Sequence, residues 1–156
     1  MIHFEKSVRL ADAILAKNVM NGLEDYYPGF EFWYVNKCMP GILLGTDALS
    51  VAREHDHVVG VALGKRRDDE VKLRCIRVVP SHQNRGTGLH LIDHMLRELD
   101  CDKPHCTVSE EMVHQYSRAF VNHYKFDLAR VDKGLYRRNK LEYVFNASEK
   151  FADSVI

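Results

Sequence analysis

The chain has 156 residues, of which 46% are hydrophobic, and its 22 basic residues balance its 22 acidic residues. That length suits one domain with a substantial hydrophobic core. The charge balance argues against a partner held mainly by electrostatic attraction, such as bulk duplex DNA. The N-terminal segment MIHFEKSVRLADA carries charges where a signal peptide needs an apolar run, and no segment approaches the ~18 apolar residues of a membrane helix. We therefore expect a cytoplasmic protein with no membrane partner.

The four cysteines, Cys38, Cys75, Cys101 and Cys106, show no C-x-x-C spacing, and reduced thiols are expected in the cytoplasm. Cys101 and Cys106 lie near His105 in the sequence, which raises the question of a metal site. A second ligand pair at suitable spacing is missing from the sequence, so no metal is predicted.

The first third of the chain is predicted to be mainly helical, after a short strand at MIHF. Leu10, Ile14 and Val19 recur near helical spacing, and Ser7 is available as an N-cap. The next segment, residues 26–45, mixes aromatic residues with prolines and glycines, which predicts a short helix between loops. We interpret its aromatic cluster as core or as the wall of a pocket, because it lacks the basic surround of a nucleic-acid platform.

Three strands are predicted in the middle of the chain, at ALSVARE, VVGVALGK and VKLRCIRVV. The short polar segments EHDH and RRDDE connect them, so the strands are expected to form an antiparallel meander. Along the third strand, the alternation assigns Val71, Leu73, Cys75 and Val79 to one face and Lys72, Arg74, Ile76 and Val78 to the other.

Downstream of Gly88 the apolar period becomes helical, with Leu89, Ile92, Leu96 and Leu99 on one stripe. The remaining predicted elements are a strand over 105–111, a helix over 112–126, and strands over 127–134 and 135–146. This order predicts an α+β fold, with a mixed, mainly antiparallel sheet and helices on both faces. We expect a single domain over residues 1–146 and a C-terminal tail over 147–156.

The loop Gln83-Asn84-Arg85-Gly86-Thr87-Gly88 connects the third strand to this helix. The first turn of a helix has free N–H groups and a partial positive charge, so anions bind there. Gly86 and Gly88 allow the backbone to approach a phosphate closely, and Gln83 and Arg85 add hydrogen-bond donors. The loop matches neither G-x-G-x-x-G nor the G-K-[ST] of a P-loop. It is interpreted either as a phosphate cradle or as an ordinary strand-to-helix turn.

The loop does match the pattern Q/R-x-x-G-x-G/A, placed after V-V-P at the end of a hairpin strand and before an amphipathic helix. A later strand and a helix ending RAFVNHYKF complete the context. Together these features resemble the GCN5-related N-acetyltransferase (GNAT) superfamily over residues 48–145. The N-terminal helices fit the more variable, substrate-binding half of that superfamily.

The resemblance implies that acetyl-coenzyme A is the cofactor and that the loop amides hold its pyrophosphate. The pantetheine arm is expected to lie along the third strand like an added strand. A backbone amide near Val78 is expected to polarise the thioester carbonyl. The implied cofactor-binding residues are Ile76, Arg77, Val78, Val79, Gln83, Asn84, Arg85, Gly86, Thr87, Gly88, Leu89, His114 and Ser117.

The implied reaction is direct attack of an amine on the thioester, for which a base must accept the amine proton. Many members of the superfamily carry a glutamate for this purpose on the third strand, and here that position is Lys72. Glu70 lies two residues earlier on the same face, and Glu110 and Glu111 follow the next strand. These three glutamates are the candidate bases, and a solvated surface carboxylate is the alternative interpretation of each.

The residue that the resemblance implies as the general acid is also different in this sequence. Helices of the superfamily often end F-Y-x-x-x-G-F, where the tyrosine protonates the departing thiolate. Aligned on FVNHYKF, the tyrosine position is Val121 and the glycine position is Lys125. Tyr116 is then the candidate acid, although it is expected to face elsewhere on the helix, and Tyr124 falls at a usually buried position. Alternatively the thiolate leaves without a protein acid, since a thiol pKa of ~8.5 makes it a tolerable leaving group.

The predicted function is therefore an N-acetyltransferase that acts on a primary amine of a small molecule or a protein, and a homodimer is considered. Lys72 and Val121 favour an alternative, a catalytically weak acyl-CoA-binding regulatory module. The basic runs 65–67 and 137–140 raise a third interpretation, a toxin-like acetyltransferase of aminoacyl-tRNA. The neutral net charge weighs against nucleic acid as a partner. The sequence does not identify the acceptor.

Overall fold

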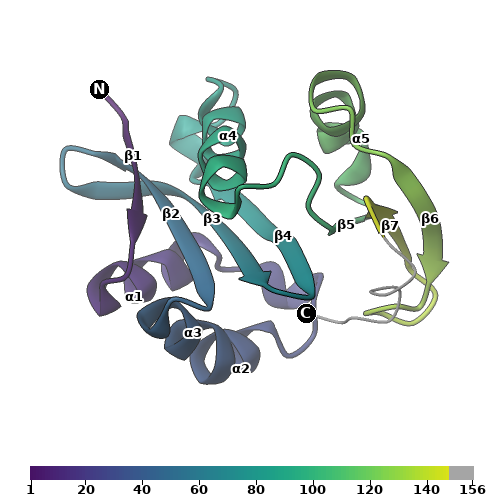
Figure 1. Cartoon of the computed structure of the whole chain (residues 1–156), viewed down its shortest axis with the longest axis horizontal. Coiled ribbons are helices and arrows are strands. Elements are labelled where there is room, and N and C mark those ends of the chain that lie inside the picture. Colours follow the sequence, from purple (N-terminus) through teal and green to yellow (C-terminus); the bar gives the residue numbers. More distant parts are fainter. Residues whose placement is uncertain (148–156) are drawn as a thin grey trace.

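The computed structural model describes residues 1–147, so the tail expected over 147–156 lies, apart from its first residue, outside the described residues. Two antiparallel sheets form the frame of the molecule (Figure 1). The first sheet, in the order β1-β2-β3-β4, consists of β1 (His3–Ser7), β2 (Asp47–Glu54), β3 (His57–Arg67) and β4 (Glu70–Val78). The second, in the order β5-β7-β6, consists of β5 (Cys106–Ser109), β6 (Leu128–Lys133) and β7 (Leu141–Phe145). The predicted meander is confirmed, and a first strand is present, although it spans His3–Ser7 rather than the predicted MIHF.

The two sheets meet at one short parallel contact between β4 and the residue before β5. The N–H of Leu73 donates to the carbonyl of His105 over 3.0 Å, and the N–H of His105 donates to the carbonyl of Val71 over 3.0 Å. Beyond this contact β4 and β5 diverge (Figure 1). The part of β4 that follows Leu73 therefore has one backbone edge that β5 does not pair.

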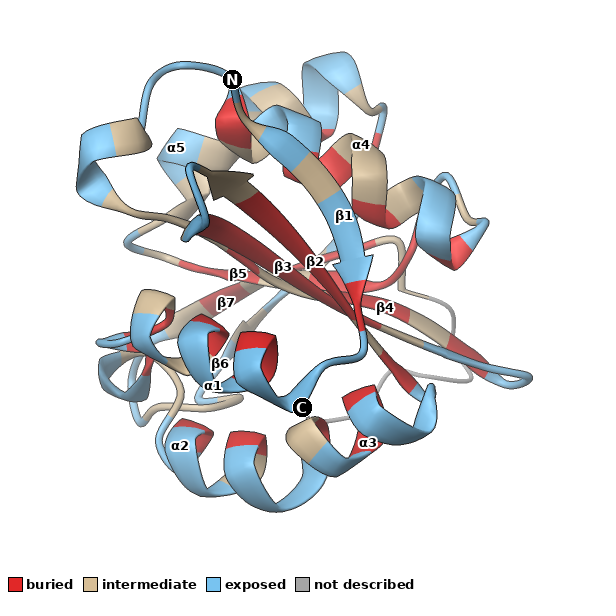
Figure 2. Cartoon of the chain, turned by 90° about the vertical axis from the view of Figure 1, so that its left-hand side faces the viewer, coloured by how far each residue is buried: buried red, intermediate tan, exposed pale blue. Residues whose placement is uncertain are grey.

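Helices cover both faces of the first sheet, as Figure 2 shows. α1 (Leu10–Val19) and α3 (Met39–Leu44) pack on one face, and α4 (Thr87–Leu99) packs on the other against all four strands. The predicted α+β fold with helices on both faces is confirmed. The shorter helices are η1 (Leu23–Asp25), α2 (Phe30–Trp33), η2 (Tyr34–Cys38), η3 (Pro80–His82), α5 (Val113–Ser117) and η4 (Arg118–His123).

α1 is a helix as predicted, but it does not bury the predicted stripe. Leu10 and Ile14 are 51% and 49% exposed, whereas Ala16 is fully buried. A small side chain at the contact lets the helix axis lie close to the sheet, which is why the alanine side faces inward. Ser7 is not an N-cap either: it ends β1, and its hydroxyl donates to the carboxylate of Asp12 over 2.6 Å.

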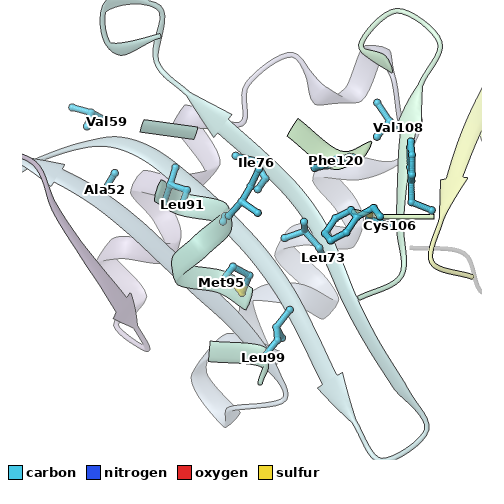
Figure 3. Close-up of a cluster of buried hydrophobic side chains, with 14 residues drawn as sticks. Ala52, Val59, Leu73, Ile76, Leu91, Met95, Leu99, Cys106, Val108 and Phe120 are labelled. Carbon is cyan, nitrogen blue, oxygen red and sulfur yellow. The ribbon is translucent and has the colours of Figure 1, made fainter. Parts of the chain in front are cut away.

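α4 packs closely on the sheet because β3 carries two glycines beneath it. A Cβ added at Gly64 would lie 2.6 Å from the sulfur of Met95, and one at Gly60 would lie 2.9 Å from Leu91. Leu89 is exposed, so the buried apolar stripe of α4 starts at Leu91 rather than where the sequence predicts it. Figure 3 shows this core, which continues from α4 toward β5 and η4 through Leu73, Ile76, Cys106, Val108 and Phe120.

β4 contains a bulge at Arg74, which the sequence does not predict. Leu73 and Cys75 pair with consecutive residues of β3, so Arg74 is left without a partner in the ladder. As a result Leu73 and Ile76 both join the core under α4, while Cys75 packs in the second core on the side of α1. The predicted alternation along this strand is therefore wrong beyond Leu73.

The helix predicted over 112–126 is realised as α5 followed by the π-helical turn η4. It anchors Phe120 in the core, and the chain then turns back through Lys125 into buried Phe126. Lys125 adopts a φ of +57°, in the left-handed region that favours glycine. This is the position at which the resemblance predicts a glycine.

Candidate active site

A cleft lies where β4 and β5 diverge, and it has two adjoining compartments. The α5 compartment has about 580 Å³ of empty space and is closed on one side by Met112, Tyr116 and Phe120. The aromatic compartment has about 460 Å³. Five residues line this compartment but not the other, namely Phe30, Trp33, Lys72, His105 and Tyr136. The two compartments share Tyr27, Leu73, Arg74, Cys75, Cys106 and Thr107.

The loop between β4 and α4 presents unpaired backbone N–H groups. Gly86 caps α4 with a φ of +80°, and Asn84 also adopts a left-handed φ, of +60°. Among the described residues, no hydrogen bond is donated by the backbone N–H groups from Asn84 to Leu89, and the first helical bond runs from His90 to Gly86 over 3.0 Å. This is the arrangement in which a helix N-terminus binds an anion. The loop can therefore act as the predicted cradle.

Gln83 fixes this loop to the end of β4. Its side-chain amide donates to the carbonyl of Val78 over 2.9 Å. Since that carbonyl points away from β3, Val78 presents its own N–H on the same free edge. Ile76, two residues earlier, faces the same way, because its carbonyl accepts a hydrogen bond from Tyr116. Val79 faces β3 instead, since its N–H donates to Val59 over 2.9 Å.

Of the four strand residues expected to bind the cofactor, Ile76 and Val78 thus present backbone groups to the cleft side. Arg77 alternates with them, as Val79 does, and its carbonyl lies near Gly60 of β3. The side chain of Arg77 nevertheless lines the α5 compartment. Every second residue along this edge of β4 therefore presents its backbone groups to an extended ligand.

Glu70, the first candidate base, lies outside both compartments. Its carboxylate is 9% exposed and pairs with Lys65 over 2.5 Å and with Lys72 over 2.9 Å. Burial lowers the pKa of Lys72, while the neighbouring carboxylate favours its charged form. The structure thus places Glu70 in a buried ion-pair cluster at the start of β4 rather than beside the widening cleft.

Glu110 and Glu111 are also engaged elsewhere. Glu110 accepts a hydrogen bond from the backbone N–H of Leu141 over 3.2 Å. Glu111 forms a two-pronged pair with Arg137, at 2.7 and 2.8 Å, which lowers the pKa of Glu111 to about 2. A carboxylate with so low a pKa is a weak proton acceptor near neutral pH. Neither residue lines the cleft.

Tyr116, by contrast, does lie in the cleft, although the sequence indicated that it faces elsewhere. Its hydroxyl donates to the carbonyl of Ile76 over 3.2 Å, across the α5 compartment. Burial raises the pKa of Tyr116 above its usual value, so the hydroxyl keeps its proton. Tyr124 donates to Asp93 over 2.6 Å and to the carbonyl of Leu89 over 3.1 Å, which ties η4 to α4.

His114 and Ser117 do not line either compartment. His114 is exposed, and the hydroxyl of Ser117 donates to the carbonyl of His114 over 3.1 Å within α5. Val121 is 44% exposed on η4, so the position expected to hold a tyrosine carries an apolar side chain at the surface.

Glu142 is a candidate functional residue that was not predicted from the sequence. This residue lies on β7, is 3% exposed, and accepts a hydrogen bond from the hydroxyl of Tyr27 over 3.0 Å. Thr107 of β5 is a second hydrogen-bond partner, and both partners line the two compartments. Burial raises the pKa of Glu142 to about 7. The sequence does contain an indication of this residue, since Glu142 lies within the otherwise apolar segment LEYVF. A glutamate in such a strand is buried only when it has polar partners.

No helix in the described part of the chain is long and apolar enough to cross a membrane. A comparison with curated protein sequences finds no match to this chain. Among solved structures, the ribosomal-protein-S18-alanine N-acetyltransferase from Escherichia coli is similar, with a TM-score of 0.68, 16% identity, and 96% of this chain and 97% of that chain covered. A GNAT-family acetyltransferase from Bacillus cereus gives a TM-score of 0.68 at 18% identity, covering 93% and 95% of the two chains.

A GNAT-family acetyltransferase from Elizabethkingia anophelis, solved with acetyl-CoA bound, gives a TM-score of 0.58 at 15% identity, covering 92% of this chain and 95% of that chain. These likenesses establish the fold. The sequence model of the acetyltransferase (GNAT) family matches residues 16–124, which is most of the chain and contains both the loop and β4. The chain therefore belongs to the acetyltransferase (GNAT) family.

Proposed function

We propose that this protein transfers an acetyl group from acetyl-CoA to a primary amine by direct attack. The observation that carries the proposal is that the amides of the loop and the free edge of β4 are continuous with each other. The unpaired amides of the loop 84–89 lie at the end of β4, and the free edge of β4 leads from them into the cleft. Gln83 holds the two together through its bond to Val78.

The residues present fit acetyl-CoA. The amides of the loop suit a pyrophosphate, because neither Gly86 nor Gly88 has a side chain to keep the phosphates away. The edge groups of Ile76 and Val78 suit the amides of a pantetheine arm, which would bind as an added strand. The N–H of Val78 is the proposed donor to the thioester carbonyl.

Bound acetyl-CoA supplies an activated acetyl group, whose carbonyl carbon the amine attacks with loss of coenzyme A. The amine must lose a proton, and we assign its uptake to Glu142 through Tyr27. Glu142 has a pKa of about 7, which suits a base that works near neutral pH. Its partner Tyr27 lies in the wall shared by both compartments, so a proton can pass by way of its hydroxyl.

Tyr116 is the proposed acid. It keeps its proton at neutral pH and its hydroxyl lies at the free edge of β4. It would protonate the sulfur of the leaving coenzyme A, in the role that Val121 cannot fill. In this proposal Tyr116 and Glu142 replace the residues that the sequence pattern lacks.

The aminoacyl-tRNA interpretation receives less support, because several cations of the basic runs have partners within the protein. Lys65 pairs with Glu70, and Arg66 donates to the carbonyl of Leu99 at the end of α4. Arg137 pairs with Glu111. Cations held in this way are less able to neutralise the phosphates of an RNA.

Two measurements test the proposal. Titration calorimetry with acetyl-CoA should give saturable binding, and release of free thiol should accelerate when an amine panel is added. The panel should contain small amines, amino acids and a peptide with a free N-terminus. Binding without thiol release on any amine would favour the regulatory-module interpretation. Absence of binding would contradict both interpretations.

A further inference from the structure

We propose that the aromatic compartment binds the carboxylate of a small amino acid, through Arg74 and His105, and that the amine of this amino acid is the acetyl acceptor. This inference rests on the proposed function and specifies its substrate class. It concerns the residues of the aromatic compartment that the acetyl-transfer proposal leaves without a role.

Arg74 is the first of these residues. The bulge in β4 removes it from the strand ladder and directs its side chain into the wall shared by both compartments. The side chain is 10% exposed, yet its Nε and Nη1 have no hydrogen-bond partner within the described part of the chain. Buried guanidinium N–H groups without partners are costly, and native structures usually pair them. A ligand that accepts these hydrogen bonds would remove that cost.

The charge of Arg74 is only partly balanced. Asp47 lies 3.6 Å from Nε, beyond hydrogen-bond distance, and its Oδ1 is likewise without a hydrogen-bond partner among the described residues. Asp47 approaches from the side of α3, where a Cβ on Gly41 would collide with it. At this distance Asp47 leaves the N–H groups of the guanidinium available to a second acceptor.

His105 is a further polar residue in the wall of the same compartment. Its Nε2 is buried without a hydrogen-bond partner in the described chain, and the residue is 6% exposed. Burial, with Lys72 nearby, lowers the pKa of His105 to about 4, so the ring is neutral at physiological pH. In the tautomer that carries its proton on Nε2, the ring donates one more hydrogen bond to the same ligand.

A carboxylate is the group that best satisfies these donors. Its two oxygens accept paired hydrogen bonds from one guanidinium, and its charge complements that of arginine. Trp33 covers the guanidinium face with its ring centre 4.8 Å from the carbon of the guanidinium, which fixes the plane of the group. Tyr27 and Tyr136 pack edge to face at 5.1 Å on another part of the wall. These rings suit an apolar or aromatic side chain on the ligand.

The position of the compartment relative to the proposed base explains why one molecule would carry both groups. Tyr27 belongs to both compartments and donates to Glu142. An amine near the Tyr27 hydroxyl and a carboxylate at Arg74 therefore occupy neighbouring parts of one cleft. In a free amino acid these groups are separated by a few bonds, whereas in a peptide acceptor the N-terminal amine and the carboxylate are far apart.

The test compares amino acids with the amines formed by their decarboxylation. The pairs are L-phenylalanine with 2-phenylethylamine and L-leucine with 3-methylbutylamine. Calorimetric binding to the protein saturated with coenzyme A needs no turnover, and thiol release from acetyl-CoA gives kcat and KM for each compound. We expect each amino acid to bind about 10- to 100-fold more tightly than its amine, the range for a hydrogen-bonded charged group. Equal or weaker binding of the amino acids would overturn the inference.

The variants are Arg74→Gln and the double variant Arg74→Gln/Asp47→Asn. The single variant leaves the Asp47 carboxylate buried without its cation, so it can lose stability, whereas the double variant removes both charges together. In each variant that folds, the preference for the amino acid over its amine should disappear, and coenzyme A binding should be retained. Arg97→Gln, an exposed arginine on α4, is the matched control and should keep the preference.

The two proposals fail differently. If no amine of either kind releases thiol but amino acids bind selectively and lose that selectivity with Arg74, acetyl transfer is wrong and the carboxylate site stands. If amines without a carboxylate are acetylated as well as the amino acids, acetyl transfer stands and the carboxylate site is wrong. A selectivity that survives in the double variant also overturns the assignment to Arg74.

Discussion

The hydroxyl of Tyr116 donates a 3.2 Å hydrogen bond to the carbonyl oxygen of Ile76, which joins α5 to the free edge of β4. The hydroxyl therefore lies where an extended ligand would pair with the strand. If it protonates the leaving thiol, Tyr116→Phe should lower kcat by about 100-fold, the lower end of the range for a positioned acid. Steady-state thiol release, together with calorimetric coenzyme A binding, measures the two effects separately.

Tyr124→Phe is the matched control for this variant. It removes a hydroxyl that ties η4 to Asp93, so it should cost about 1 kcal/mol of stability and leave the rate per folded molecule near that of the wild type. A Tyr116→Phe protein with unchanged kcat would mean that the hydroxyl only positions α5.

The pH dependence of the rate should follow Glu142. Because the base is active when ionised, the rate should rise with pH through an inflection near 7, the pKa to which burial raises this carboxyl. Glu142→Gln should remove that inflection and lower kcat by about 100-fold. Glu70→Gln should keep the inflection where it is. The same inflection in the Glu142→Gln protein would assign the titration to another group.

Glu142 should also make the stability of the fold depend on pH. Its pKa is raised from 4.5 to about 7 in the folded state, so between these values the folded protein binds more protons than the unfolded chain. Stability therefore falls as pH rises from 4.5 to 7, and above 7 the cost is about 3 kcal/mol at most. Urea unfolding of Glu142→Gln should show added stability at pH 8.5 and little at pH 4. Equal gains at both pH values would show that the titration of Glu142 is not the cause.

The cradle can be tested with three glycine variants. Gly86 and Gly134 both adopt left-handed φ, of +80° and +82°, and each has room for a Cβ. Gly86→Ala and Gly134→Ala should each lose about 1–2 kcal/mol of stability, but only Gly86→Ala should weaken coenzyme A binding. Gly88→Val has no left-handed strain and has its nearest neighbour, Val78, at 3.9 Å. It should fold normally and bind coenzyme A about tenfold more weakly or worse.

Coenzyme A affinity equal to that of the wild type in Gly88→Val would mean that the loop is only a turn. Weakened binding in Gly134→Ala, which lies in the connection between β6 and β7, would mean that lost stability rather than lost space explains the Gly86 result.

Lys125 offers a stability prediction that does not involve the cofactor. Its φ of +57° is strained for any residue with a Cβ. Lys125→Gly should therefore raise the free energy of unfolding by about 1 kcal/mol, measured by urea denaturation. Lys125→Ala keeps the strain and removes the long side chain, so it should change stability little. If alanine stabilises the fold as much as glycine, the side chain rather than the backbone is responsible.

The sequence was a sound guide where the pattern is local. The meander, α4 and the glycine loop that precedes α4 follow from alternation, helical period and glycine placement, which act within a few residues. The superfamily pattern was also a good guide at Lys125. The backbone of this residue takes the left-handed conformation that the expected glycine would take.

The remaining features depend on contacts between distant segments. The bulge at Arg74 interrupts a strand whose sequence alternates on both sides of it, so alternation alone placed Ile76 and Cys75 on the wrong faces. Glu142 is brought to Tyr27, 115 residues away, only by the contact between the loop after η1 and the second sheet. For the same reason, Tyr116 lies in the cleft although its spacing from Val121 indicated otherwise.

The short contact between the sheets has a consequence for dynamics. Within the described chain, the backbone pairing of β4 with the segment leading into β5 consists of the bonds from Leu73 to His105 and from His105 to Val71. A motion that separates the two sheets at this contact must break these bonds. Hydrogen–deuterium exchange at the amides of Leu73 and His105 would therefore report how often the cleft opens, and slower exchange on adding coenzyme A would measure how strongly a ligand lying along β4 closes the two halves of the molecule.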